Sequence, residues 1–203
     1  MAVTTPKQAR ARETFDRVLD AAAELLVDKG IEGLNTNEVA RLAGVNIATL
    51  YRYFDDKYDL VDGLLSRYSQ LQVAKISEQM QQFDDPRERL NHILVLQLEL
   101  MEQHPWLGAV NIALRASPQL KEVRERNRAY MRDMVLGQLG EGAANLRSPI
   151  NLGERQKAAA RLSTEIWGTG LTTIAEAPVA ERPALMTEFK ILLNAYLDTM
   201  SAD

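Results

Sequence analysis

The chain has 203 residues, of which 46% are hydrophobic and 26% are charged, a composition that excludes a disordered or fibrous protein. It has no cysteine, which excludes disulfide bonds, thiolate metal sites and a cysteine nucleophile. No apolar run approaches the roughly 20 residues of a membrane span, and residues 1–15 lack the apolar core of a secretory signal, so we expect a cytoplasmic protein with no membrane partner. The net charge of −4 confines any DNA-binding face to a local surface.

Helical periodicity predicts four helices in the first third of the chain. The first covers residues 12–29 and stops at Gly30. A second, over 35–43, is capped by Asn35, with Glu38 reaching back as in a capping box. A third covers 46–54 and is capped by Asn46, and a fourth runs from 57 to about 82. The residues expected in the core of the two short helices are Val39, Ala40, Leu42, Leu50 and Phe54.

The rest of the chain also predicts helices, separated by prolines that begin or end them. We place these helices at 87–103, 106–115, 118–139, 154–177 and 183–200. Residues 140–152 are rich in glycine, asparagine, serine and proline and predict a long loop. The fold class is therefore all-α.

The two short helices joined through Gly44 match a helix-turn-helix pattern, although periodicity alone leaves plain structural packing as an alternative. Residues 30–60 resemble the helix-turn-helix of the TetR/AcrR family of bacterial transcriptional regulators. The shared features are Gly30, Val39-Ala40, Ala43-Gly44-Val45, Thr49-Leu50-Tyr51, Tyr53-Phe54, Lys57 and Leu60. The resemblance is specific over about 60 residues and elsewhere concerns architecture alone.

The resemblance implies an N-terminal three-helix DNA-binding domain followed by a larger helical ligand-binding and dimerisation domain. We expect a flexible arm at 1–11, the DNA-binding domain at 12–60 and the second domain at 61–203. The implied partners are double-stranded operator DNA, a small-molecule effector and a second copy of the chain, with no cofactor and no metal.

The resemblance places the DNA contacts in the helix-turn-helix, where the second helix enters the major groove from its first residue, Asn46. Hydroxyl, amide and ammonium groups would contact phosphates, and these belong to Asn35, Thr49, Tyr53 and Lys57. Base contacts are expected from Thr36, Asn37, Ile47, Ala48, Tyr51 and Arg52. Apolar groups recognise only the thymine methyl and asparagine pairs with adenine, so half-sites containing A/T pairs are predicted.

Three of these DNA-contact residues have an alternative interpretation. Ile47 shares a face with Leu50 and Phe54 and could belong to the core. Arg52 could bind phosphate or pair with Asp56, and Lys57 could be an ordinary solvated lysine.

Residues 90–101 are apolar on nearly every side, which predicts a centrally buried helix. In TetR-like proteins this region helps to wall an effector pocket, while simple core packing is the favoured interpretation of any single residue. The candidate pocket residues are His92, Leu96, Gln97, Trp106, Arg115, Tyr130, Met134 and Trp167. Apolar walls with a few polar groups suit a lipophilic or aromatic molecule.

The last two predicted helices carry apolar stripes that need cover, either within the monomer or, as the resemblance implies, in a four-helix dimer interface. The residues assigned to this interface are Leu162, Ile166, Gly170, Leu185, Phe189, Leu192, Leu193 and Tyr196. A two-fold dimer would read a pseudo-palindrome with half-sites about 34–36 Å apart or a multiple of that distance.

The predicted function is therefore a dimeric, effector-responsive transcriptional regulator, with repression as the family default. No HExxH, GxSxG, Walker A or GxGxxG string occurs, so an enzyme is not expected. The alternative is a helical scaffold or interaction protein without sequence-specific DNA binding.

Overall fold

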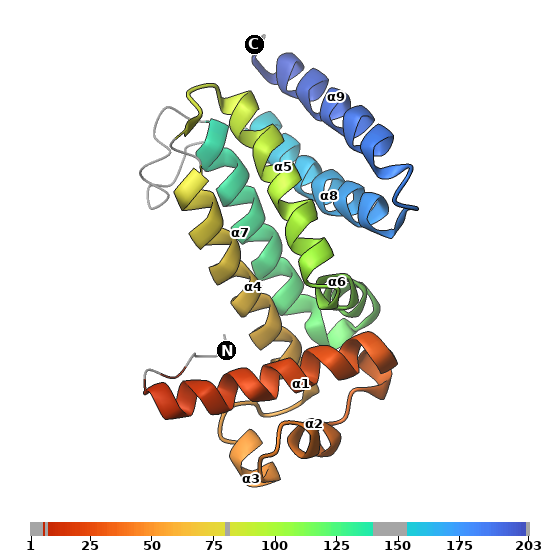
Figure 1. Cartoon of the computed structure of the whole chain (residues 1–203). Coiled ribbons are helices and arrows are strands. Elements are labelled where there is room, and N and C mark those ends of the chain that lie inside the picture. The colour runs from red at the N-terminus through yellow and green to blue at the C-terminus, as the bar shows by residue number, and fades with distance from the viewer. Residues whose placement is uncertain (1–5, 7, 80–81, 140–153, 202–203) are drawn as a thin grey trace. The chain divides into compact units, whose positions relative to one another are not determined.

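The computed structural model describes residues 6, 8–79, 82–139 and 154–201, and the regular elements within these ranges are all helices (Figure 1). The all-α prediction is confirmed. The elements are α1 (Ala9–Gly33), α2 (Thr36–Leu42), α3 (Ile47–Leu50), α4 (Lys57–Gln79), α5 (Pro86–Gln103), α6 (Trp106–Ala116), η2 (Pro118–Leu120), α7 (Lys121–Leu139), α8 (Glu154–Glu176) and α9 (Arg182–Ser201). Among these described helices, none combines the length and the apolarity that a membrane crossing requires. The predicted loop 140–152 lies outside the described residues.

Most predicted helix boundaries agree with the structure to within a few residues, and two differences have clear causes. Gly30 has φ 64° and interrupts α1 at the predicted stop, but one further turn continues to Gly33. Regular helix in α3 ends at Leu50, four residues earlier than predicted. The chain then tightens, because the amides of Arg52 and Tyr53 bond to carbonyls three residues back, as in a 3-10 turn.

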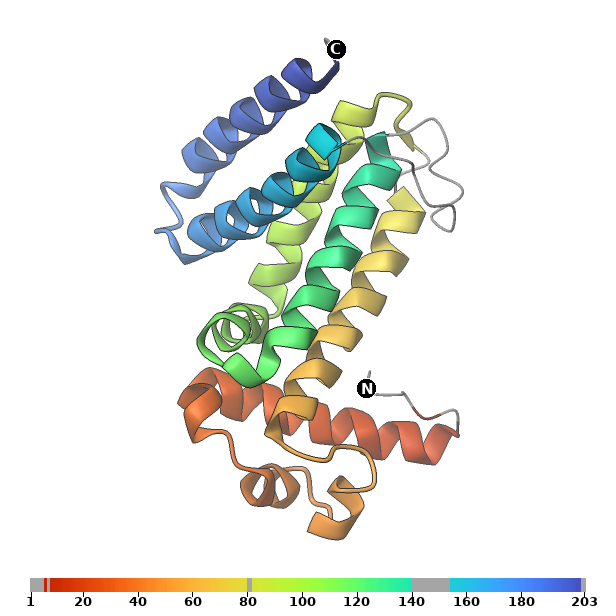
Figure 2. The same ribbon diagram turned by 180° about the vertical axis from the view of Figure 1, so that it is seen from behind.

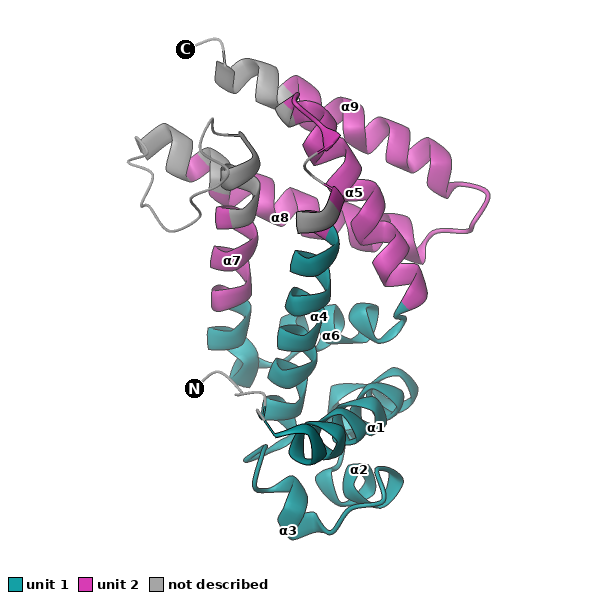
Figure 3. Ribbon diagram, turned by 60° about the vertical axis from the view of Figure 1, so that its left-hand side comes forward, with its two compact units in different colours: residues 1–75, 104–124 teal, residues 76–103, 125–203 magenta. Residues whose placement is uncertain are grey.

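The chain forms two compact units, which Figure 3 distinguishes by colour. The first contains residues 1–75 and 104–124, and the second contains 76–103 and 125–203. Helices α4 and α7 each contribute to both units. The first unit thus includes α6 and the start of α7 in addition to the segment 12–60 expected to form the DNA-binding domain.

Helix α1 supplies the centre of the first unit's core. Its fully buried Val18, Leu19 and Ala22 belong to a cluster that also contains residues of α2, α3, α4 and α6. The prediction that Leu42 is core is wrong, because this side chain is 40% exposed. At 100° per residue Leu42 lies about 110° around α2 from the buried face formed by Val39, Ala40 and Ala43.

The second unit contains α5, most of α7, α8 and α9, and Figure 2 shows α8 and α9 side by side. Buried apolar residues line α5 and α8, among them Ile93, Leu94, Trp167 and Ile174. The guanidinium of Arg182 closes the turn between α8 and α9, since it donates to the carbonyls of residues 175 and 177 and to the Glu102 carboxylate at 2.7–3.0 Å.

Candidate nucleic-acid interface

Helix α2 begins at a side-chain cap that the sequence predicted. The Asn35 Oδ1 atom accepts hydrogen bonds from the amides of Asn37 at 2.9 Å and Glu38 at 3.4 Å. The predicted return bond from Glu38 is wrong, because its carboxylate instead binds Lys29 Nζ at 2.7 and 2.8 Å. The hydrogen bond from Lys29 holds the pKa of Glu38 below its ordinary 4.5. Glu38 therefore joins α2 to the end of α1.

The turn between α2 and α3 requires a left-handed residue. Gly44 has φ 64°, a conformation that side chains with a Cβ rarely adopt. The following amide, of Val45, bonds to the Ala40 carbonyl at 3.0 Å and closes the end of α2. Helix α3 then begins at Asn46, whose Oδ1 accepts from the Ala48 amide at 2.8 Å. Both short helices thus have the asparagine caps expected from the sequence.

Residues 46–54, in which base contacts were predicted, are called the recognition segment below, and an aromatic cluster holds the end of this segment against α1. Phe54 stacks on Phe15 with ring centroids 4.9 Å apart, and Tyr53 meets the Phe15 ring edge-on at 5.9 Å. Phe54 is 1% exposed, whereas Tyr53 is half-buried. The Tyr53 ring therefore supports the fold, whatever its hydroxyl contacts. The sequence interpretation missed this packing, although the Tyr53-Phe54 pair was a visible signal.

Lys57, the predicted phosphate contact at the start of α4, also contacts the protein. Its Nζ atom donates to the Ile31 carbonyl at 2.9 Å and lies 3.9 Å from a Glu32 carboxylate oxygen. The side chain is 23% exposed, so the interpretation as a simply solvated lysine does not describe it. An ammonium group has three donors, and two of them remain for other acceptors.

The other predicted DNA-contact residues differ in exposure. Asn35, Asn37, Asn46, Ala48, Tyr51 and Arg52 are exposed, while Thr36, Ile47 and Thr49 are half-buried. Ile47 packs against the core cluster, in line with its alternative interpretation. The Thr36 and Tyr51 hydroxyl groups lie 3.0 Å apart and join α2 to α3.

The proposed pair of Arg52 with Asp56 is absent between these two described residues. Asp56 instead caps α4, because its Oδ1 accepts from the amides of Tyr58 at 2.7 Å and Asp59 at 3.0 Å. The Arg52 guanidinium is exposed on the recognition segment and carries five donors that match phosphate or guanine acceptors.

The candidate effector residues are divided between the two units. Trp106 and Arg115 lie on α6 in the first unit, and Arg115 is exposed. The second unit contains His92, Leu96, Gln97, Tyr130 and Trp167, whereas the side chain of Met134 lies outside the described residues. Within this set the structure joins two residues, because Trp167 Nε1 donates to the buried Oε1 of Gln97. His92 Nε2 lies 2.6 Å from Gln79 Oε1, and burial raises the pKa of Tyr130 above 10.0.

The candidate interface residues on α8 and α9 also divide. Leu162 and Leu192 are 53% and 52% exposed, but Leu193 is buried. Gly170 and Phe189 contact each other within one chain. Ile166 and Leu185 are half-buried, and Tyr196 lies outside the described side chains. The sequence interpretation did not include Ile191 among the candidate interface residues, although it is 56% exposed. Its position next to Leu192 and Leu193, which were included, was the available signal.

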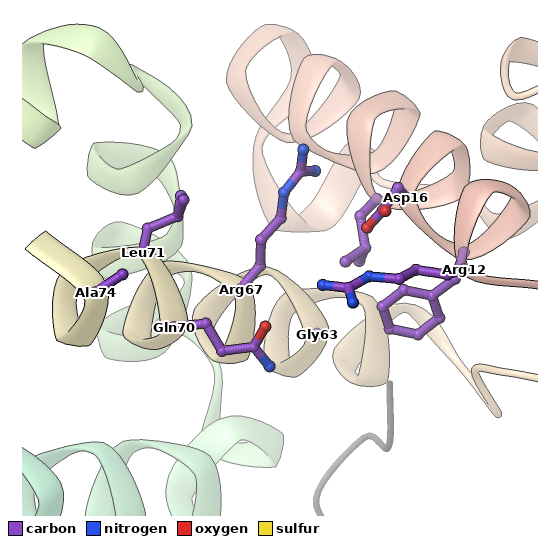
Figure 4. Close-up of a pocket in the computed structure, with 9 residues that line it drawn as sticks. Arg12, Asp16, Gly63, Arg67, Gln70, Leu71 and Ala74 are labelled. Carbon is purple, nitrogen blue, oxygen red and sulfur yellow. The ribbon is translucent and has the colours of Figure 1, made fainter. Parts of the chain in front are cut away.

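A hollow of about 330 Å³ lies between α1 and α4 (Figure 4). Its lining residues are Arg12, Phe15, Asp16, Leu19, Gly63, Arg67, Gln70, Leu71 and Ala74. Both signs of charge face it, and Arg67 is engaged with Asp20 at 2.6 Å. None of the predicted site residues lines this hollow, and its mixed lining favours no single class of ligand. Among the described residues, no group of three or more histidine or acidic side chains could hold a metal ion.

Comparison with known proteins places this geometry in a family. Residues 18–64 match the family described as bacterial regulatory proteins, tetR family. Residues 18–64 therefore form a TetR-family domain within the chain. The matched segment includes most of α1, the whole α2–turn–α3 unit and the first turns of α4, the elements described above.

A curated relative agrees with the match of residues 18–64. An uncharacterized HTH-type transcriptional regulator of Bacillus subtilis, YvkB, is 35% identical over 123 residues, which cover 61% of this chain and 62% of YvkB. The chain thus matches less than two thirds of this relative's length.

Solved structures of transcriptional regulators share the fold. A TetR-family regulator from Streptomyces coelicolor has a TM-score of 0.69 and 23% identity, covering 92% of this chain and 98% of the other. FadR of Bacillus subtilis, solved in complex with stearoyl-CoA, has a TM-score of 0.66 and 21% identity, covering 86% of this chain and 97% of FadR. At these identities the likeness concerns the fold.

Proposed function

We propose that the protein is a transcriptional repressor that binds a palindromic operator as a homodimer and leaves it when a small lipophilic or aromatic effector binds. The observation that carries the proposal is the capped α2–turn–α3 unit. It presents the exposed side chains of Asn37, Ala48, Tyr51 and Arg52 on and around a recognition helix. Such a helix reads base edges in the major groove, while surrounding polar groups fix its register on the phosphates.

The buried face of the unit supports this role. Leu50 and Phe54 are almost fully buried, and Asn46 caps the helix with its own side chain. The backbone of the recognition segment is therefore fixed before DNA binds, so the segment loses little conformational entropy on binding. The exposed side chains of Asn37, Ala48 and Arg52 are polar or small, as base and phosphate contacts require.

Release by an effector is inferred from the family resemblance and from one buried polar pair. Gln97 is 1% exposed, and its Oε1 accepts from Trp167 Nε1. Its Nε2 has no partner among the described residues, although a buried unsatisfied donor costs about 1–3 kcal/mol. An apolar molecule with a carbonyl or carboxylate oxygen could accept from this amide. FadR, a structural neighbour, was solved with stearoyl-CoA, which combines these features.

The coupling to DNA needs one further condition. An effector can release the operator only if it binds one of two dimer geometries more tightly than the other. A molecule that binds both equally would leave operator affinity unchanged.

The test is selection from a pool of random DNA duplexes at a stated salt concentration, followed by sequencing of the retained DNA. We expect enrichment of one palindrome with A/T pairs in its half-sites. Tyr53→Phe and Lys57→Ala should weaken binding to the enriched duplex. If the wild-type protein retains no sequence above background, the repressor proposal fails and the helical scaffold is the better interpretation.

A panel of long-chain fatty acids, their alcohols and their coenzyme A thioesters then tests the effector part. We expect at least one of them to release the selected duplex, and Gln97→Leu to weaken that release. Failure of the entire panel would remove the lipophilic effector from the proposal and leave the DNA-binding part standing.

A further inference from the structure

Thr36 and Tyr51 form a link between the two short helices of the candidate interface. Thr36 is the first residue of α2, and Tyr51 follows the last residue of α3. Their hydroxyl oxygens lie 3.0 Å apart although the two residues are fifteen positions apart in the chain. This bond connects the two helices through side chains, beyond the backbone turn at Gly44.

The rest of the Tyr51 side chain has little to hold it. The ring is 48% exposed, and it is absent from the apolar side chains packed against the core cluster. Among the ring contacts of the described residues, Tyr53 and Phe54 take part but Tyr51 does not. The hydroxyl bond to Thr36 is therefore the contact that restricts where the ring points.

The chemistry of two hydroxyl groups limits what the pair offers to DNA. Each group has one hydrogen and two lone pairs. Whichever group donates, its hydrogen is used in the shared bond, and the other group keeps one free O–H. The pair thus presents a single free O–H donor, carried by one of two oxygens that lie 3.0 Å apart beside the exposed recognition helix.

We propose that Thr36 is a positioning residue for Tyr51, and that the two side chains read one base-pair position as a single unit. This inference rests on the proposed function, because it needs sequence-specific DNA binding. It goes beyond the sequence interpretation, which expects base contacts from both Thr36 and Tyr51 without linking the two. Loss of either hydroxyl would free the ring and remove the shared donor.

A double-mutant cycle tests the proposal with the duplex that the wild-type protein selects and with all single-base variants of one half-site. The proteins are the wild type, Thr36→Val, Tyr51→Phe and the double variant. Immobilising one side chain corresponds to about two- to tenfold in affinity. We expect each single variant to lose about that much affinity, and the double variant to lose no more affinity than a single variant does. Both single variants should lose preference at the same base position.

Two controls separate positioning from a general structural effect. Thr36→Ser keeps the hydroxyl and should restore both affinity and base preference. Thr49→Val removes a hydroxyl group of the same interface that lies outside the pair. The fold-loss in DNA affinity of Thr49→Val should therefore multiply with the fold-loss of Tyr51→Phe when the two are combined. The melting temperatures of the variants should stay close to that of the wild type, because Tyr51 is exposed and neither Thr36 nor Thr49 is fully buried.

Losses for Thr36→Val and Tyr51→Phe that multiply would overturn the proposal, as would effects at different base positions or a uniform loss across all sequences. Failure of the proposed function has a different signature, since the wild-type protein would then select no duplex at all. In that case the inference fails together with the function it rests on.

Discussion

The ammonium group of Lys57 combines a structural contact with a candidate DNA contact. One donor binds the Ile31 carbonyl at 2.9 Å, while the side chain keeps 23% of its surface exposed. We expect Lys57→Met to lower the free energy of unfolding by about 1.5 kcal/mol, the low end of the range for a hydrogen bond to a charged group, since the side chain is partly exposed. We also expect the slope of log affinity against log salt to become shallower by about one unit, because one phosphate contact is lost. Urea denaturation and DNA binding at several salt concentrations measure the two effects.

Lys29→Met is the matched control, since Lys29 is also paired with an acidic side chain near the same end of α1. It should reduce stability slightly, as loss of an exposed ion pair does, and leave the salt slope unchanged. An unchanged slope for Lys57→Met itself would mean that Lys57 serves the fold alone.

His104 gives the first unit a pH dependence of its own. Burial, and then the nearby charges of Arg67 and Lys75, hold the pKa of His104 below its ordinary 6.5. The folded protein therefore binds this proton less well than the unfolded chain, so stability is full above about pH 6.5 and falls as the pH drops towards the lower folded pKa. Urea unfolding of the wild type between pH 5 and 7.5 should show this loss. His104→Asn, which carries no titrating ring, should show a flatter profile, and parallel profiles for the two proteins would contradict the assignment.

Single residues were predictable from the sequence where the interaction is local. The caps at Asn35 and Asn46 depend on amides two or three residues ahead, and both are present. The interaction assigned to Glu38 was wrong, because Lys29, nine residues away, competes for its carboxylate. The Thr36–Tyr51 bond escaped prediction for the same reason, since it depends on how the turn at Gly44 brings two helices together.

At the scale of the elements, the approach of α8 to α9 depends on one glycine. A Cβ atom added at Gly170 would overlap the ring of Phe189, whereas one added at Gly168, two residues earlier on α8, meets nothing within 4 Å. We expect Gly170→Ala to reduce the free energy of unfolding by about 1–3 kcal/mol through overpacking. Gly168→Ala should raise it by up to about 1 kcal/mol through helix propensity. Denaturation of both variants at one protein concentration measures the difference, and equal effects would show that α9 yields to the extra methyl group.

Helix positions were predictable because prolines, glycines and apolar periodicity mark them in the sequence. Pro86 begins α5, Pro118 begins η2, and Gly30 interrupts α1 where the pattern ended. The early end of α3 was not predictable, because the apolar spacing of Ile47, Leu50 and Phe54 is compatible with both a regular helix and a tightened turn. Hydrogen bonds to Thr49 and Leu50 decide between them.

At the scale of the whole molecule, the predicted domain bounds stay a prediction, while the compact units group the helices in a way that the sequence did not indicate. Helix α6 belongs to the first compact unit, because its Val110, Ala113 and Leu114 are buried in the core cluster around α1. Their apolar spacing predicted a buried helix face, but periodicity does not identify which partner buries it. Contacts between segments distant in the chain determine the grouping.

Dimerisation is the remaining expectation at this scale, and the exposed apolar side chains of α9 allow a direct test. Ile191 and Leu192 are 56% and 52% exposed. Two adjacent large apolar side chains in contact with water form an apolar patch of the kind that a second chain can cover. We expect Leu192→Glu to convert a dimeric wild type to a monomer in sedimentation equilibrium, because it would bury a charge without a partner. Val179→Glu is the matched control: Val179 is 75% exposed in the connection between α8 and α9, outside the proposed interface, and the protein should stay dimeric. The monomer should also lose affinity for the selected palindrome by about a hundredfold or more, since linked binding of two half-sites is lost. A monomeric wild type that still selects a palindrome, or a dimer unaffected by Leu192→Glu, would place the two-fold contact elsewhere.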